Sequence, residues 1–137
     1  MSWIPSPALS AAQLAATLAR LNADPTPSFI RLYSSDRPGD TADPGGHMAE
    51  IVLAKPAGTI VAGVLKLVTP AGAVPMVLTT GIPRWGLLCA GDGAPLANGK
   101  VTDAAGSGEI RIDGGVTSVG DDSPQLYAGG RIVLLET

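Results

Sequence analysis

The residues of this sequence that could do chemistry are a single histidine, a single cysteine and two groups of aspartates. His47 stands in a Gly-Gly-His-Met stretch, residues 45–48, at the foot of a predicted strand. As a general base it would need a nucleophile and an orienting carboxylate within reach. The serine of residues 106–108 lacks the flanking spacing of a nucleophile elbow. We therefore interpret His47 as an exposed loop residue and predict no catalytic residue and no enzymatic activity.

The aspartates fall in two predicted loops. Asp36, Asp40 and Asp43 cluster in the first loop, and an Asp-Asp pair at 121–122 lies in the second. A calcium loop needs oxygen ligands at defined spacing and a bidentate glutamate that closes the site, and Glu50 is not at that spacing. Aspartate favours turns because its carboxylate bonds to its own backbone. Both groups are interpreted as solvated turn residues, and no metal site is predicted.

Cysteine and glycine add no cofactor site. Cys89 lies in an apolar run, residues 85–90, which favours a small buried hydrophobic residue over a nucleophile. A single cysteine excludes an internal disulfide and any multi-cysteine metal cluster. The glycines match neither the Walker spacing nor the dinucleotide-binding spacing, so no cofactor is expected.

One helix is predicted near the start of the chain. Ser6 and Pro7 suit the N-cap and the first helical position, and residues 8–21 are rich in Ala and Leu. Leu14, Leu18 and Leu21 share one helical face. Prolines at 25 and 27 cannot continue the helix. Ahead of it, Trp3 and Ile4 form an apolar arm that docks either onto its own domain or onto a neighbour.

The rest of the chain has the pattern of short strands joined by turns. The chain holds 18 Gly and 12 Pro, spread throughout, which is typical of such a pattern. We predict an all-β fold, a β-sandwich or jelly roll of about eight short strands, over residues 28–137, preceded by the arm and the amphipathic helix, residues 1–27. The predicted strand segments are 29–33, 49–54, 59–68 (with Gly63 as a bulge), 73–79, 83–90, 100–103, 109–113, 116–119, 125–127 and 130–136.

Composition points to a surface that is covered by neighbours. Charged residues make up 15% of the chain, against about 25% in an ordinary soluble domain. The nine basic residues are scattered singly and aromatic residues make up 4%, which argues against nucleic-acid binding. The sequence also lacks a secretory signal pattern and a stretch of about 20 apolar residues that could span a membrane. These features predict an obligate oligomer made in a reducing cytoplasm, and a composition rich in small residues because of a GC-rich genome is the alternative explanation of the low charge.

Strand patterns in the chain resemble those of a family of small virion proteins of tailed bacteriophages and prophages. The similar segments are an aliphatic-Arg-aliphatic-Tyr strand with a basic-Pro turn, an Ala-Glu-led strand with Pro-Ala and Ala-Gly continuations, a Trp-bearing strand, and a closing Ala-Gly turn. They occupy residues 30–38, 48–57 with 62–65, 83–88 and 126–132. The resemblance covers about four-fifths of the chain and departs from the family pattern at residues 36–47 and 79–83.

This resemblance implies a virion structural protein that cements or decorates the capsid surface and is made in the cytoplasm of the bacterial host. Its implied partners are the major capsid protein and copies of itself, with a homotrimer expected. A tail, collar or fibre-attachment protein and a carbohydrate-binding β-sandwich remain as alternatives. Aromatic and large apolar residues are enriched at binding hot spots. The candidate interface residues are Trp3, Ile4, Leu14, Leu18, Tyr33 and Tyr127, whereas Phe29 and Trp85 are assigned to core packing.

Overall fold

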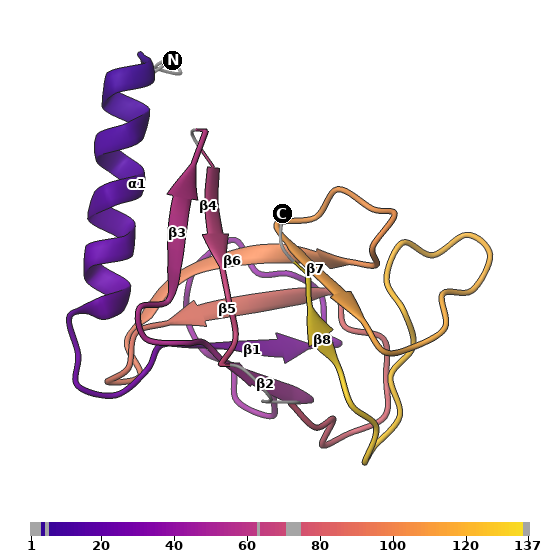
Figure 1. Ribbon diagram of the computed structural model, residues 1–137. Helices are drawn as coiled ribbons and strands as arrows, with labels where there is room; N and C mark the ends of the chain where they lie inside the picture. The colour runs from indigo at the N-terminus through magenta and orange to yellow at the C-terminus, as the bar shows by residue number, and fades with distance from the viewer. Residues whose placement is uncertain (1–3, 5, 63, 71–74, 136–137) are drawn as a thin grey trace.

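The protein contains one helix and eight short strands, seen in a computed structural model that describes residues 4, 6–62, 64–70 and 75–135. The candidate Trp3 lies outside the described residues. Figure 1 shows the elements in chain order. They are α1 (Pro7–Asn22), β1 (Phe29–Tyr33), β2 (Ala49–Val52), β3 (Gly58–Val61), β4 (Val64–Leu67), β5 (Trp85–Cys89), β6 (Pro95–Thr102), β7 (Ile110–Asp113) and β8 (Val133–Leu134).

Helix α1 begins where the sequence predicts. The Ser6 hydroxyl accepts a hydrogen bond from the backbone N–H of Leu9 at 3.2 Å, and Pro7 occupies the first helical position. This bond satisfies one of the backbone donors that every helix leaves unpaired at its start. The helix ends at Asn22, ahead of the proline at 25. The predicted helix is therefore confirmed.

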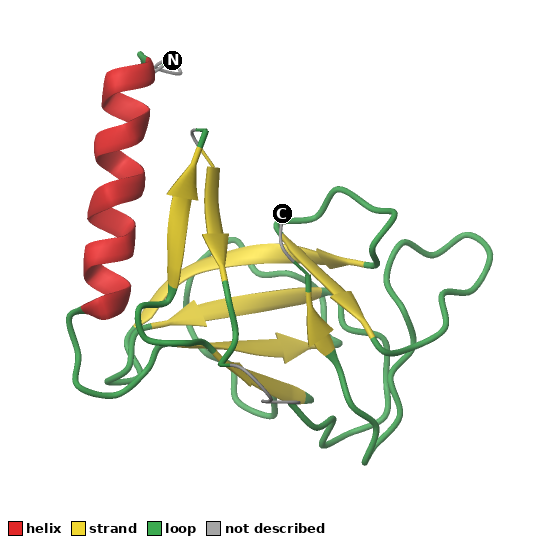
Figure 2. Ribbon diagram, in the orientation of Figure 1, coloured by secondary structure: helices red, strands yellow, loops and turns green. Residues whose placement is uncertain are grey.

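Six strands form one curved sheet in the order β2-β1-β5-β6-β7-β8. Neighbouring strands are antiparallel except for β6 and β7, which run parallel. Strand β1 lies beside both β2 and β5, so residues far apart in the chain meet on one surface. Figure 2 shows this sheet wrapping around itself, with loops filling the remaining sides.

A short segment, residues 75–78, nearly closes the sheet by pairing with both of its edges. Val77 bridges Ala49 of β2, and Met76 bridges Arg131, two residues ahead of β8. The Leu78 N–H donates to the Met48 carbonyl at 2.7 Å, and the Val77 N–H donates to the Gly130 carbonyl at 2.8 Å. We call this closure the seam. It satisfies backbone groups that an open edge strand would leave unpaired.

The main core fills the inside of this barrel-like sheet. Alternate residues of each strand point inward, as the period of a β-strand requires. The inner cluster is apolar and comes from most of the strands, the seam and the end of α1. Its largest fully buried members include Leu21, Ile30, Leu32, Ile51, Leu53, Val77, Val101, Ile112, Leu126 and Ile132.

Strands β3 and β4 form a separate two-stranded hairpin that stands beside α1 and projects from the barrel (Figure 1). The prediction of one long strand over residues 59–68 is wrong, because the chain reverses at Ala62. Ala62 adopts a φ of 52°, a left-handed conformation that non-glycine residues rarely take. The hairpin register pairs Ile60 with Leu65.

The predicted all-β fold, a sandwich or jelly roll of about eight short strands behind one helix, is confirmed in a barrel-like form. Several predicted strands are shorter than expected. The segments around residues 76, 116 and 125 contribute isolated bridges rather than extended strands. Among the described residues, no helix has the length and hydropathy needed to cross a membrane.

The alternation in β2 makes a prediction about stability. Ile51 is 0% exposed, whereas its neighbour Val52 points outward and is 42% exposed. We expect Ile51→Ala to lower the free energy of unfolding by about 2–5 kcal/mol, because it leaves a cavity in the core. Val52→Ala, the matched control, should cost less than about 1 kcal/mol. Urea denaturation measures both values, and equal losses would contradict the inward and outward assignment.

Candidate functional site

The densest group of titratable side chains lies on the outer face of β1 and β2. Asp43, from the loop after β1, accepts hydrogen bonds from the Arg31 guanidinium at 2.7 Å, from the Tyr33 hydroxyl and from the Gly45 N–H at 2.8 Å. Arg31 also lies 3.6 Å from a Glu50 carboxylate oxygen. The Asp43 carboxylate thus ties residues 34–47 to β1, and Asn98 of β6, which bonds to Arg37 and to the Pro38 carbonyl, ties the same loop to the other side of the sheet.

These contacts shift the protonation equilibria of their members. The hydrogen bond from Tyr33, with further bonds from Gly45 and Arg31, lowers the pKa of Asp43 below its usual value. Burial, together with the bond to Asp43, raises the pKa of Tyr33 above its ordinary value. The hydrogen bond to Asp43 raises the pKa of Arg31. Asp43 is therefore a charged acceptor at neutral pH and Tyr33 a neutral donor, which is the arrangement of a clamp.

His47 borders this cluster but is not the exposed loop residue that the sequence predicts. Its side chain is 24% exposed, because the ring packs edge-on against Tyr33 with centroids 6.4 Å apart. Its Nε2 atom lies 3.6 Å from a Glu50 carboxylate oxygen, beyond hydrogen-bond length. No described hydroxyl or thiol is hydrogen bonded to His47, so the cluster shows no nucleophile and base pair.

A small aromatic core lies beneath this loop. The Tyr33 and Trp85 rings stack with centroids 4.4 Å apart, and the Trp85 indole N–H donates to the Ser35 hydroxyl at 3.2 Å. Cys89 belongs to the same cluster, and burial raises the pKa of its thiol. The predictions that Cys89 is a buried hydrophobic residue and that Trp85 belongs to the core are confirmed.

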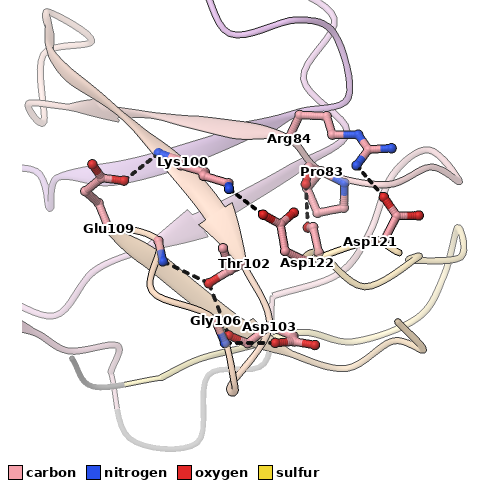
Figure 3. A network of polar contacts seen from close by, with 11 residues as sticks. Pro83, Arg84, Lys100, Thr102, Asp103, Gly106, Glu109, Asp121 and Asp122 are labelled. Atoms are coloured by element: carbon pink, nitrogen blue, oxygen red, sulfur yellow. Dashed lines mark hydrogen bonds and ion pairs between the residues drawn. The ribbon is translucent and has the colours of Figure 1, made fainter. Parts of the chain in front are cut away.

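A second polar network holds the loops where β5 begins and β6 ends (Figure 3). Arg84 pairs with Asp121 at 2.7 Å, and Lys100 pairs with Asp122. Asp103 accepts from the Gly106 N–H at 3.0 Å and from the Thr117 hydroxyl at 2.8 Å. Asp43, Asp121 and Asp122 are therefore more than the solvated turn residues that the sequence predicts, because each pairs with a cation on or beside a strand.

Both clusters hold loops in place and neither gathers metal ligands. In the part of the chain that the structure describes, no group of three or more His, Cys, Asp or Glu side chains could hold a metal ion. Among the described residues, Asp43, Asp121 and Asp122 pair with cations, whereas Asp36 and Asp40 do not.

One exposed apolar surface covers the outside of the seam. Met76 and Leu78 point outward on either side of the buried Val77, and Tyr127 starts a turn whose Gly129 and Gly130 are hydrogen bonded to Val77. Gly129 has a φ of 82°, a conformation that favours glycine in this turn. The members of this seam patch are 42–59% exposed: Val52, Met76, Leu78, Tyr127 and Val133.

A second apolar surface runs along α1. Leu9 is 51% exposed, and the alanines at 8, 11, 12, 15, 16 and 19 are exposed as well. Only Leu21 is buried, where the helix meets the barrel core. Most of α1 therefore stands away from the barrel beside the β3–β4 hairpin (Figure 1).

The structure separates the predicted interface residues into three groups. Ile4 and Tyr127 are exposed and available to a partner. Leu14 and Leu18 are half-buried, and Leu18 packs against the core of its own chain. Tyr33 is buried under the loop that Asp43 holds, so its ring is occupied by contacts within the chain.

Sequence reasoning missed most of the seam patch. Val52, Met76 and Val133 lie in three separate segments, and each looks like an ordinary strand residue. Alternation along each strand was the one available signal for these exposed residues, because one of every two neighbouring side chains faces outward. It does not show which outward residues meet across the seam.

Comparison with known protein families, with characterised proteins and with solved structures finds no match to this chain. The functional argument therefore rests on the residues and contacts described above.

The Asp43 clamp predicts a pH-dependent contribution to stability. The lowered pKa of Asp43 means that its contribution is present above about pH 4, the unfolded value, and is lost as pH falls through the lower folded value. We expect Asp43→Asn to lower the free energy of unfolding by about 2 kcal/mol at pH 7. The gap between wild type and variant should shrink as the pH falls below 4.

Chemical denaturation across pH 2.5–7 measures this difference. Asp36→Asn is the matched control, because the Asp36 carboxylate has no hydrogen bond or ion pair with a described residue. A pH-independent gap for Asp43→Asn, or an equal loss in the control, would contradict the clamp.

Proposed function

We propose that this chain is a non-enzymatic structural subunit that binds other protein subunits through its exposed apolar surfaces. The observation that carries this proposal is the seam patch, where five large apolar side chains are exposed on β2, on β8, on the seam and on the turn at Tyr127. Contiguous exposed apolar patches on soluble domains mark interaction sites.

The chemistry around the patch favours a protein partner. Met76 is flanked by Arg131 and Glu50 on the two neighbouring strands. Protein interfaces combine apolar side chains with polar and charged ones. A nucleic acid or an anionic membrane surface would instead require clustered Lys and Arg, and the chain carries a net charge of −3.

The barrel holds this surface in place before a partner binds. The patch residues come from strands and a turn that backbone hydrogen bonds hold together, so they need little ordering on binding. A preorganised surface loses less conformational entropy when it docks. Tyr127, which the sequence analysis selected, lies in this patch and supplies an aromatic residue of the kind enriched at hot spots.

The resemblance to small virion proteins of tailed bacteriophages supports a particular setting for this role. We propose that the chain is a cement or decoration protein on the capsid surface, with the major capsid protein as its partner at the seam patch. Binding that requires the assembled lattice would stabilise the shell by mass action, because the bound state exists only when the lattice is assembled. Small interfaces suffice when symmetry repeats them around a shell.

This proposal predicts that a charge in the seam patch abolishes capsid binding without unfolding the chain. Met76 is exposed, so Met76→Glu should leave the thermal midpoint within a few degrees of wild type. A glutamate at this position lies opposite Arg131 but adds a carboxylate that an apolar contact would have to desolvate, so binding should weaken at least about 10-fold. The assay is co-sedimentation with capsids that were assembled without this protein by the phage that encodes it.

Val119→Glu is the control, because Val119 is fully exposed at the tip of a different loop. It should bind capsids as wild type does and should raise their resistance to heat equally. Wild-type protein that ignores capsids, or that binds tails or fibres instead, would contradict the capsid assignment. Equal binding by Met76→Glu would remove the seam patch from the interface.

A further inference from the structure

The loop after β1, residues 34–47, is bound to the barrel only through hydrogen bonds that involve side chains. It lies outside the helix and the strands, and none of its residues shares a backbone-to-backbone hydrogen bond with another described residue. Such bonds resume at Met48, whose N–H donates to the Leu32 carbonyl at 2.8 Å. Segments of this kind open at a lower free-energy cost than paired strands do. We call residues 34–47 the strap.

Two side chains make the main anchors of the strap. Towards its end, the Asp43 carboxylate holds it to β1 through the bonds described above. In its middle, the Asn98 side chain of β6 accepts from the Arg37 Nε at 2.7 Å and donates to the carbonyls of Pro38 and Asp40. Because β5 lies between β1 and β6, these anchors place the strap across all three strands.

A second apolar core lies between the strap and the sheet. It is separate from the main core inside the barrel, because its members alternate with the inward-facing residues of β1 and β5. The strap contacts this core directly, since the Ser35 hydroxyl accepts from the Trp85 indole and the His47 ring packs against Tyr33. The members of this second core are Phe29, Tyr33, Trp85, Leu87 and Cys89.

Cys89 lies beneath the Asp43 anchor. It is paired with Phe29 across β5 and β1, and the Arg31 guanidinium lies 4.8 Å from the centroid of the Phe29 ring. The same guanidinium donates to Asp43. Burial raises the pKa of the Cys89 thiol, and the charges of Arg31 and Asp43 shift it in opposite directions. With the strap closed, Cys89 is 1% exposed.

The chain supplies a hinge beside the Asp43 anchor. Gly45 and Gly46 adopt φ values of 76° and 73°, which favour glycine, and each has open space where a side chain would lie. Hinges are short segments that absorb large changes in φ and ψ. These two glycines therefore allow the strap to move without displacing β2, which begins at Ala49.

We propose that the strap opens as a unit while the barrel stays folded, and that the Asp43 and Asn98 anchors keep it closed. The open form exposes the apolar outer face of β1 and β5, which the closed form covers. The seam patch lies on β2, on β8, on residues 75–78 and on the turn at Tyr127, so this opening is separate from the proposed capsid contact. The chain then has two states, and a molecule that binds the exposed face selects the open one.

Thiol labelling of the full chain tests this proposal, because Cys89 is the only cysteine. The reagent is a chromogenic aromatic disulfide in excess at about pH 8, where an exposed thiol reacts readily. The labelling rate is measured at urea concentrations from zero to the unfolding midpoint. Opening of the strap exposes far less surface than unfolding of the barrel, so the rate should hardly change with urea at low concentrations. It should rise steeply only where the barrel itself unfolds.

Two variants remove the anchors one at a time. Asp43→Asn should raise the labelling rate in the urea-independent range at least about 10-fold, because a neutral amide loses the charge-assisted bond from Arg31. Asn98→Ala should raise it at least about 3-fold, because it removes the bonds at the middle of the strap. Asp36→Asn is the matched control and should label at the wild-type rate. It makes the same chemical change in the same strap at a carboxylate without a described partner.

A wild-type labelling rate that depends on urea as steeply as global unfolding does, from zero urea upward, would overturn the inference, because Cys89 would then react only when the barrel unfolds. Asp43→Asn and Asn98→Ala variants that label at the wild-type rate would overturn it as well. Far-ultraviolet circular dichroism verifies that each variant is folded under the labelling conditions.

Discussion

The architecture depends on the backbone pairing of residues 75–78 with both edges of the six-stranded sheet. Without it, β2 at one end of the strand order and β8 at the other would each present unpaired backbone groups. Val77 satisfies both sides at once, because it bridges Ala49 and exchanges hydrogen bonds with the turn at Gly129 and Gly130. Since strand neighbours point in opposite directions, burying Val77 forces Met76 and Leu78 to face outward. The closure that stabilises the barrel therefore also creates its apolar surface.

Many of the charged side chains hold loops in place. The charged clusters clamp loops against the barrel, with Asp43 holding the loop after β1 and the Arg84 and Lys100 pairs holding the loops beyond β6. Residues 4–19, which include most of α1, carry no charge at all.

Local features of the fold could be predicted from the sequence. Ser6 and Pro7 fixed the start of α1, and alternation at Phe29–Tyr33 and around Ile110 and Ile112 identified β1 and β7. The hairpin within residues 59–68 was missed because the run is apolar throughout and reverses at Ala62, without the Asn-Gly or Asp-Gly turn that usually marks a hairpin. The role of Asp43 was missed because its partners Arg31 and Tyr33 are 12 and 10 residues away. They meet Asp43 only when the loop folds back over β1.

The candidate surfaces were less predictable than the fold. The sequence selected Tyr127 and Ile4, both exposed, but also Tyr33, which the loop covers. Which outward-facing residues gather at the seam depends on long-range pairing between Ala49, Val77 and Arg131, and no local pattern encodes that pairing. Short-range periodicity separates inside from outside, whereas only the closed sheet determines which outside residues become neighbours.

The most direct measurement is a cryo-electron-microscopy reconstruction of phage particles that carry this protein. Our account predicts density for it on the outer surface of the capsid, with Met76, Leu78 and Tyr127 against the major capsid protein. Density at the tail or collar would contradict the proposed setting. A capsid-bound protein whose seam patch faces solvent would contradict the central claim that exposed apolar surfaces make its contacts.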